Sequence, residues 1–280
     1  MYDFKNGYFT FCEANRTLTF NGNYNIITRA MIPDNLKLYI KNIVISEGIK
    51  QIDRCAFADF PNLENITISN SVERLCVKAL SGCANLKNIT IGNSVSVIED
   101  DCFYGCVNLN NVYISDLSNW CNIKFWSPYS NPLAYTAKLY LNNAWITDVT
   151  IPNNIAQIDK FAFVHCEGLR KVVIPDNVKN ISYASFYGCK DLEMVRVNNG
   201  TLAIDEAAFY DCPSLTYISL PDSIEFMGVD ALPDNSSNLT IKCKKDGPVD
   251  RLCKTKGINT YVSKIDRFIN SVNSLDDHTK

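Results

Sequence analysis

The segment "AFVHCEGLRKVVIP" at residues 162–175 is followed by two segments with the same pattern, "SFYGCKDLEMVRVN" at 185–198 and "AFYDCPSLTYISLP" at 208–221. In all three segments Phe, Cys and Leu occupy the same places, so each of these residues returns 23 residues later. A fixed period of roughly 20–50 residues is typical of folds built from stacked supersecondary units. The repeat therefore decides the fold.

Each unit contains a short strand, a turn and a closing motif. The strand has the pattern Leu-x-x-h-x-h, where h is aliphatic, and this alternation predicts a half-buried strand. A turn such as "IPDNV" at 174–178 follows, because Pro and Asn or Asp favour tight-turn geometry. A second apolar pair comes next, and Ala-Phe-x-x-Cys closes the unit and predicts one helical or 3₁₀ turn. The Leu column contains Leu63, Leu86, Leu109, Leu169, Leu192 and Leu215.

A single unit of this size cannot bury its apolar side chains alone, so the units must stack. Stacking places like positions in parallel sheets of short strands around a continuous core. The predicted fold is therefore one repeat solenoid of α/β type. Its predicted parts are an N-terminal cap at 1–42, the solenoid at 43–242 with an enlarged repeat at 115–150, a C-terminal cap at 243–263 and a flexible tail at 264–280.

Both caps have recognisable signals. Asn6-Gly7 and Asn21-Gly22 are strong hairpin turns, which predicts an N-terminal β-hairpin cap. Gly247-Pro248 opens a predicted helix between two strands, with Val249, Leu252 and Cys253 on one face. That face is expected to cover the last unit of the solenoid.

The full pattern, Ile-Pro-x-x-Val-x-x-Ile-x-x-x-Ala-Phe-x-x-Cys-x-x-Leu-x-x-Val-x-Ile, is similar to that of the BspA-like leucine-rich repeat proteins. It is most complete at residues 151–221, and the units at 43–114 match it in the core columns. The segment "TIKCKKDGPVDRLCKTKGINTYV" at 240–262 resembles the closing element of that family. The resemblance implies a leucine-rich repeat fold with a non-enzymatic recognition or adhesion role, at the cell surface or after secretion.

Composition excludes several function classes. The 280 residues are 46% hydrophobic and 20% charged with a net charge of −3, which gives no support to a nucleic-acid partner. No segment approaches the roughly 20 apolar residues that span a bilayer, so no membrane insertion is predicted. The first twenty residues contain no basic region followed by an apolar run. Localisation therefore stays open between the cell surface or secretion, which the family resemblance implies, and the cytoplasm.

Twelve cysteines raise the alternatives of a metal site, a disulfide framework or structural thiols. No Cys-x-x-Cys pair is present and the only histidines are His165 and His278, so neither a metal site nor a cofactor is predicted. The closing column reads Phe60, Cys83, Cys106, Cys166, Cys189, Cys212. Because Phe replaces Cys in the first unit, the column is expected to fill volume with reduced, buried thiols. Cys243 and Cys253 are the expected exceptions.

The enlarged repeat contains all three tryptophans, Trp120, Trp126 and Trp145, together with Tyr129. One interpretation is an aromatic platform that binds a glycan or a peptide, because Trp and Tyr give a large contact area with a polar end. The other interpretation is that an enlarged repeat needs large side chains to fill its own core. The second interpretation is favoured, and the first is kept as an alternative surface.

The preferred partner surface is the outward side of the strands. The outward positions carry small Thr and Asn in the early units, and in the later units Lys171, Met194, Arg196 and Tyr217. Arg and Tyr are frequent interface anchors, so these four residues, with Tyr113 at the edge, form the candidate surface. A merely solvated sheet is the alternative.

Catalytic motifs are not found in the sequence. It contains no Gly-rich phosphate loop and no nucleophile elbow. His165 is beside Cys166, but the Phe-x-x-Cys frame gives that cysteine a structural role. The prediction is a non-enzymatic module that binds a protein, such as a host or other-cell surface protein, or a glycan. An intracellular interaction scaffold is the alternative function.

Overall fold

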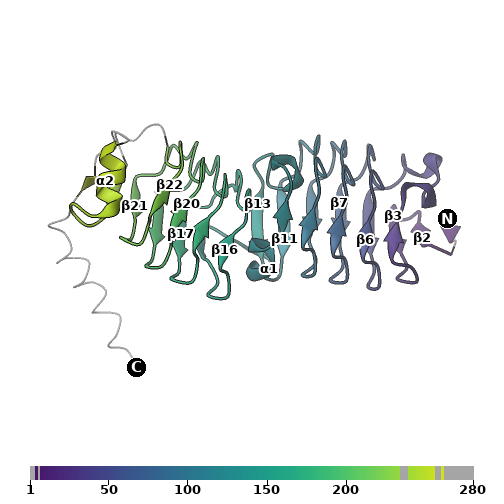
Figure 1. Ribbon diagram of the computed structural model, residues 1–280. Helices are drawn as coiled ribbons and strands as arrows, with labels where there is room; N and C mark the ends of the chain where they lie inside the picture. The colour runs from purple at the N-terminus through teal and green to yellow at the C-terminus, as the bar shows by residue number, and fades with distance from the viewer. Residues whose placement is uncertain (1–3, 6, 234–238, 256–259, 262–280) are drawn as a thin grey trace, which may run out of the picture.

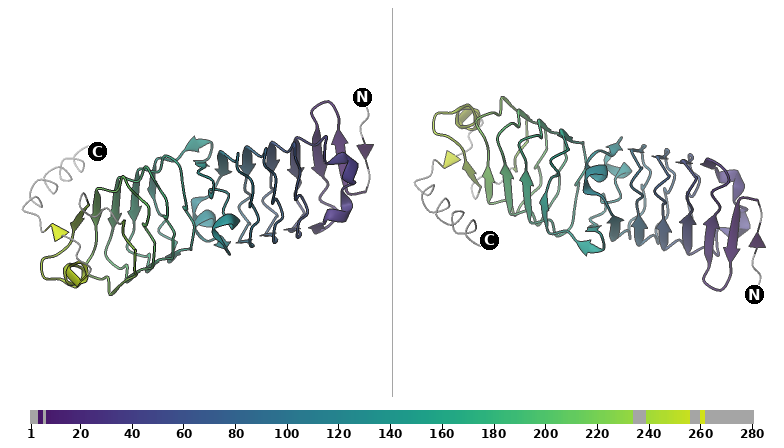
Figure 2. Two further views of the ribbon diagram at one scale, coloured as in Figure 1. Left: turned by 90° about the horizontal axis from the view of Figure 1, so that it is seen from above. Right: turned by 90° about the horizontal axis from the view of Figure 1, so that it is seen from below.

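The computed structural model describes residues 4–5, 7–233, 239–255 and 260–261. The chain winds into a stack of coils, here called rungs, that runs from the N-terminal to the C-terminal cap (Figure 1). Figure 2 shows the strands in two rows along the stack, with the core between them. The predicted solenoid is confirmed. The predicted tail at 264–280 lies outside the described residues.

The Leu-x-x-h-x-h segments form the longer strands, which belong to two sheets. Successive rungs pair in parallel with a 23-residue offset, as in Val172 with Val195. The nine-stranded sheet contains β1 (Phe4–Lys5), β2 (Phe9–Cys12), β3 (Thr17–Phe20), β5 (Asn42–Ile45), β7 (Asn65–Thr67), β9 (Asn88–Thr90), β11 (Asn111–Ile114), β13 (Lys138–Leu141) and β14 (Ala144–Trp145). The six-stranded sheet contains β15 (Asp148–Thr150), β17 (Lys171–Ile174), β19 (Met194–Val197), β21 (Tyr217–Ser219), β23 (Thr240–Lys242) and β24 (Thr260–Tyr261).

The second apolar pair of each unit forms a two-residue strand, and these strands make the other row. Its five-stranded sheet contains β4 (Ile26–Ile27), β6 (Gln51–Ile52), β8 (Arg74–Leu75), β10 (Val97–Ile98) and β12 (Lys124–Phe125). Its four-stranded sheet contains β16 (Gln157–Ile158), β18 (Asn180–Ile181), β20 (Ala203–Ile204) and β22 (Phe226–Met227).

Helices are short and few within the described residues. They are the 3₁₀ helices η1 (Arg29–Met31), η2 (Asp34–Leu36) and η3 (Pro128–Ser130), and the α-helices α1 (Leu117–Cys121) and α2 (Pro248–Thr255). In this part of the chain no helix has the length and apolar character needed to cross a membrane.

The Ala-Phe-x-x-Cys segments form consecutive turns that connect the two rows of strands. Their backbone N–H groups donate alternately within the turn and to the next rung. Phe186 donates to the Ala208 carbonyl at 2.9 Å, Tyr187 donates within its own turn to Ala184 at 3.2 Å, and Gly188 donates to Tyr210 at 2.9 Å. Because each rung is bonded to the next along this side as well, the expected helical turn becomes a third line of contact between rungs.

The closing cysteine fills space and also donates a hydrogen bond. The Cys189 thiol donates to the Phe163 carbonyl of the preceding rung, with an S···O distance of 3.0 Å. Cys83, Cys106 and Cys212 make the same contact at 3.1, 3.3 and 3.2 Å. All twelve cysteines are free thiols, including Cys243 and Cys253. The repeated cysteine is thus a small apolar residue that also satisfies a buried carbonyl.

Thiol labelling should separate two classes of cysteine. Nine of the twelve are buried, whereas Cys12, Cys55 and Cys243 are partly exposed. Burial raises the pKa of Cys166 to about 12, so its thiol keeps its proton at neutral pH and is a poor nucleophile. We expect a soluble disulfide reagent to label at most the three partly exposed thiols of the folded protein and all twelve after denaturation without reductant. Mass spectrometry that finds the buried column in disulfides would contradict this assignment.

The enlarged repeat interrupts both rows of strands at the same level. On one row β13 pairs antiparallel with β14, and β15 begins a new sheet. On the other row β12 ends one sheet and β16 begins the next. The stack changes direction at this teal segment in both views of Figure 2. We call this level the joint.

Side chains bridge the joint where the sheets stop. The indole Nε1 of Trp120 donates to the Ala162 carbonyl at 2.9 Å, and the amide of the fully buried Asn131 donates to the Phe161 carbonyl at 2.8 Å. Trp120 is only 1% exposed. Its assignment to an alternative binding surface was therefore wrong, because this side chain fills the core of the enlarged repeat.

Both caps contain the predicted kinds of element, but the predicted hairpin turn at Asn21-Gly22 was wrong, because the β2–β3 turn lies at residues 13–16 and the chain crosses to the other row after β3. At the N-terminal end β1, β2 and β3 pair antiparallel, and β3 then pairs in parallel with β5 of the solenoid. At the C-terminal end α2 lies between β23 and β24, with Val249 and Cys253 fully buried and Leu252 packed against the core. The first and last rungs are thus covered.

Candidate functional site

The six-stranded sheet has one face in the core and one face directed outward. Along β19 the burial alternates strictly, so Val195 and Val197 are buried while Met194 and Arg196 are exposed. β17 repeats this pattern with Lys171 exposed. The alternation follows from the two-residue period of a strand. The outward face therefore carries the residues predicted from the sequence.

Strand register aligns these outward residues in two rows. Lys171, Met194 and Tyr217 are register partners across β17, β19 and β21, so they form one row. Arg196 lies in the neighbouring row, beside Ser219. Adjacent strands are about 4.8 Å apart, which makes the row a continuous strip of side chains. We call these four residues, Lys171, Met194, Arg196 and Tyr217, the outer strip.

The equivalent positions of the nine-stranded sheet are occupied by a structural ladder. There the amide of Asn65 donates to Asn42, that of Asn88 to Asn65, and that of Asn111 to Asn88, each at 2.7 Å. Within the described part of the chain, no ion pair or side-chain hydrogen bond involves Lys171 or Tyr217. The outer strip therefore has side chains available for a partner, whereas the Asn ladder holds its own rungs together.

Tyr113, the predicted edge of the surface, is in a different sheet. It lies on β11 of the nine-stranded sheet and stacks on Tyr140 of β13, with ring centroids 4.8 Å apart and planes 25° apart. It borders a shallow depression of about 360 Å³, together with Thr67 and Thr90. The structure therefore does not bring Tyr113 into the same sheet as the outer strip.

The remaining aromatic residues of the enlarged repeat do not form one platform. Trp145 is 44% exposed, but its indole Nε1 donates to the Glu167 carbonyl at 3.3 Å and the ammonium of Lys138 lies 4.9 Å from its ring centroid. Trp126 is also exposed, and its backbone carbonyl accepts a hydrogen bond from the Lys160 ammonium rather than from a residue near Trp145. Of the predicted alternative surface, Tyr129 borders a sizeable groove.

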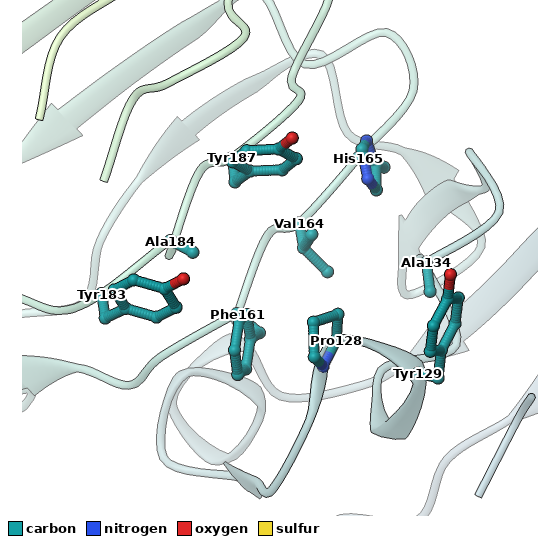
Figure 3. Close-up of a pocket in the computed structure, with 9 residues that line it drawn as sticks. All are labelled: Pro128, Tyr129, Ala134, Phe161, Val164, His165, Tyr183, Ala184 and Tyr187. Atoms are coloured by element: carbon teal, nitrogen blue, oxygen red, sulfur yellow. The ribbon is translucent and has the colours of Figure 1, made fainter. Parts of the chain in front are cut away.

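That groove lies on the turn side of the solenoid at the joint and has a volume of about 370 Å³. Figure 3 shows Val164 between Tyr129 and His165 on one side and Tyr183 and Tyr187 on the other. Phe161 borders the same groove. We call this feature the aromatic groove.

Two edge-to-face ring pairs hold the groove in shape. Phe161 packs against Tyr183 with centroids 5.6 Å apart and planes at 88°. His165 packs against Tyr187 at 5.3 Å and 85°. Edge-to-face pairs are favourable because the positive ring edge meets the negative ring face. The rings are thus positioned before any ligand arrives.

Phe161 and His165 both have left-handed backbone conformations, with φ of 63° and 52°. The equivalent residues of other rungs are left-handed at both positions. At the position of His165, the other rungs have residues that adopt this conformation more easily. In the His165 column the other residues are Asp59, Gly82, Gly105, Gly188 and Asp211. A bulky residue such as Phe161 is an outlier here, at a cost of roughly 1–3 kcal/mol. Both exceptions border the aromatic groove.

Sequence reasoning did not identify this groove. It considered His165 only as a neighbour of Cys166, although an imidazole replaces Gly or Asp at this repeat position. The repeat alignment contained the signal, since the ring of His165 stands at a position where the other rungs have Gly or Asp, the residues that tolerate a left-handed backbone. The contribution of Tyr129 could not be found in this way, because it lies outside the 23-residue register.

His165 and Cys166 do not form a reactive pair. Burial lowers the pKa of His165 and raises the pKa of Cys166 to about 12, so both side chains are neutral at pH 7. A thiolate–imidazolium nucleophile requires the opposite shifts. Among the described residues, no three His, Cys, Asp or Glu side chains are grouped as metal ligands would be.

Comparison with known proteins gives one family and several structures. The family model for the BspA type leucine rich repeat region matches residues 34–127 and 136–246, with six copies. The pneumococcal vaccine antigen PcpA is similar at 14% identity, over 94% of this chain and 99% of that chain, with a TM-score of 0.42. The Treponema pallidum protein TpLRR is similar at 16% identity, over 90% and 94%, with a TM-score of 0.39. A search of curated proteins finds no match.

Proposed function

The chain belongs to the BspA-type leucine-rich repeat family, and on this basis we propose that the outward face of its six-stranded sheet is a protein-binding surface. Repeats of this kind are typical of interaction modules without enzymatic activity. The observation that carries the proposal is the outer strip, where side chains project from rigid strands and are not used to bind neighbouring rungs.

The composition of the outer strip suits a protein partner. Met, Tyr and Arg are enriched in protein interfaces, and Met194, Arg196 and Tyr217 supply one of each. The strip lies on a preformed sheet, so binding does not require the ordering of a loop. The guanidinium Nε of Arg196 donates to Asn198 at 3.0 Å, which directs this side chain before binding.

Two locations are compatible with such a module. The role implied by the family resemblance is adhesion to host proteins or other cells, at the surface or after secretion. The twelve free thiols favour instead an intracellular scaffold in a reducing compartment. Fractionation of the native cells, followed by immunodetection, separates the two functions.

The Arg196→Glu, Tyr217→Ala double variant should lose its partner and keep its fold. Both side chains lie on the outward face, Arg196 exposed and Tyr217 partly so, and neither belongs to the core. We expect a melting temperature within about 2 °C of the wild type, because surface changes usually alter stability by less than about 0.5 kcal/mol. Capture of a protein partner, quantified by mass spectrometry, should fall at least about tenfold, since truncated anchors cost 1–2 kcal/mol or more.

The control is Thr67→Glu, Thr90→Ala, which introduces the same two residues on the outward side of the nine-stranded sheet. This control should capture the same partner as the wild type. Unchanged capture by the Arg196→Glu, Tyr217→Ala variant would exclude the outer strip.

A further inference from the structure

The shallow depression beside Tyr113 has the features of a second binding site, separate from the outer strip. It lies on the outward side of the nine-stranded sheet, at the carboxyl ends of the strands, and contains no residue of the strip. Its volume of about 360 Å³ falls within the roughly 300–1,000 Å³ that ligand sites occupy. We call this depression the trough.

The trough is elongated along the stack. Glu47, just after β5, borders it at one end, and Asn142, just after β13, borders it at the other. The strands from β5 through β7, β9 and β11 to β13 are paired in parallel without interruption. Four spacings of about 4.8 Å give the trough a length of about 19 Å. A chain molecule therefore fits it better than a single small ring does.

Tyr113 presents one face of its ring to the trough. In its row of register partners, Thr90 lies on one side of Tyr113 and Tyr140 on the other. Tyr140 stacks on one face of the Tyr113 ring and does not border the trough, whereas Thr90 does border it. The Thr side chain ends at the γ position, so it leaves most of the second ring face uncovered. The trough therefore contains one flat apolar step.

Polar side chains line the trough on both sides of this step. On one side the Glu47 carboxylate accepts from the backbone N–H of Asn70 at 3.1 Å, and the side-chain oxygen of Asn70 accepts from the backbone N–H of Asn93 at 2.9 Å. These bonds orient both side chains and leave the Asn70 amide N–H groups free to donate. On the other side are Asn142 and Asn143, whose side chains make no hydrogen bond within the part of the chain that the structure describes. Each amide can both donate and accept.

The composition of the trough selects the class of ligand. Among the described residues no Lys, Arg or His borders it and one carboxylate does, so its charge disfavours an anion. The isoleucines that border it are at most 5% exposed, which leaves the Tyr113 ring as its main apolar surface. β7, β9 and β11 are paired on both sides, so they offer no free edge to which a peptide could add as a strand. A neutral sugar chain meets all these conditions, because each ring has an apolar C–H face and a rim of hydroxyls that donate and accept.

We propose that the trough binds a neutral oligosaccharide, with one sugar ring packed on Tyr113 and the sugar chain running along the stack. The packed ring buries its C–H face on the uncovered face of Tyr113. Its neighbours in the sugar chain bring hydroxyls to Asn70 on one side and to Asn142 on the other. Because Tyr113 projects from a strand and backbone bonds hold Glu47 and Asn70, binding immobilises few side chains that were free before.

The test is calorimetry with cellotetraose, chitotetraose, mannotetraose and lacto-N-neotetraose, and at least one of these neutral sugars should bind the wild-type chain saturably. Tyr113→Ala should weaken that binding about tenfold or more, since a lost aromatic contact is worth about that factor. Tyr113→Phe keeps the ring face and should bind within about twofold of the wild type. Asn142→Gly removes the amide but tolerates the left-handed backbone at φ 51°, and should weaken binding about threefold or more.

The matched control is Tyr104→Ala, which should bind the sugar like the wild type. It removes a 54% exposed Tyr that also packs against a second Tyr ring, 5.4 Å away, but lies outside the trough.

The trough and the outer strip are tested separately. The Arg196→Glu, Tyr217→Ala variant should bind the sugar normally, whereas Thr67→Glu, Thr90→Ala should lose the sugar and keep the protein partner, because it places a second carboxylate in the trough. The proposal is overturned if none of the four sugars binds, if Tyr113→Ala and Asn142→Gly bind like the wild type, or if 3′-sialyllactose, an acidic sugar, binds and the neutral sugars do not.

Discussion

Replacement of Phe186 by alanine is expected to lower the free energy of unfolding by about 3–5 kcal/mol. The Phe186 ring is fully buried and stacked between Phe163 and Phe209, with centroid distances of 5.1 and 5.2 Å and interplanar angles of 1° and 9°. Truncation leaves a cavity that faces both neighbouring rungs. The loss of burial and the unfilled cavity both contribute to the cost.

Urea denaturation measures the total effect, and hydrogen exchange measures its spread. Because each rung contacts only its neighbours, amides of β17 and β21 should lose protection before those of β5 and β7. The matched control is Phe226→Ala, which deletes the same atoms from a 55% exposed side chain and should cost less than about 1 kcal/mol. A uniform rise in exchange along the whole chain would contradict the rung-by-rung picture.

Cys189→Asp is expected to be more damaging than Cys189→Ala at the same position. The alanine variant loses a small volume and the thiol hydrogen bond to Phe163, at a cost of about 1–3 kcal/mol. The aspartate variant places a carboxylate at a position that is 0% exposed, so a cost above about 4 kcal/mol is expected.

The stability of the Cys189→Asp variant should also depend on pH, in a direction that can be worked out. Burial disfavours the charged form, so the new carboxyl group should have a pKa in the folded state above its unfolded value of about 3.9. The folded state then binds more protons than the unfolded state, and stability should rise as pH falls from 7 towards 4. Cys12→Asp, at a partly exposed strand position, is the control and should show little of this dependence. Equal stability of Cys189→Asp and Cys189→Ala at pH 7 would show that position 189 is accessible to water.

The repeat made most of the fold predictable, because its period fixes which residues are neighbours. Once Leu169 and Leu192 are aligned, the parallel register of Val172 with Val195 and the outward direction of Met194 follow without further information. The C-terminal cap was also predictable, since the Gly-Pro start of α2 is a local signal. In the N-terminal cap the antiparallel strands were predicted, but the turn at residues 13–16 was missed because it contains no Asn-Gly pair. The outer strip, although still a proposal as a binding site, was placed correctly on the outward face.

The joint could not be predicted, because its residues lie outside the repeat. Burial of Trp120 depends on a contact with Ala162, 42 residues away in the sequence, which no periodicity indicates. The separation of Tyr113 from the outer strip has the same origin, since an alignment does not show where a sheet stops. The aromatic groove is lined by residues of the enlarged repeat and of two regular rungs. Neither the repeat pattern nor the enlarged repeat alone therefore predicts it.

The direction of the sheet hydrogen bonds determines how the molecule responds to tension. They run from rung to rung, along the axis of the stack, so a pulling force between the two ends loads the rungs in series and every interface bears the same force. The weakest interface then sets the limit. At the joint both rows of strands are interrupted, and isolated hydrogen bonds replace the strand pairing: the side-chain bonds of Trp120 and Asn131 and the backbone bonds of Asp159 to Cys121 and Glu167 to Ala137. The mechanical strength of the solenoid therefore depends on a few hydrogen bonds at its middle.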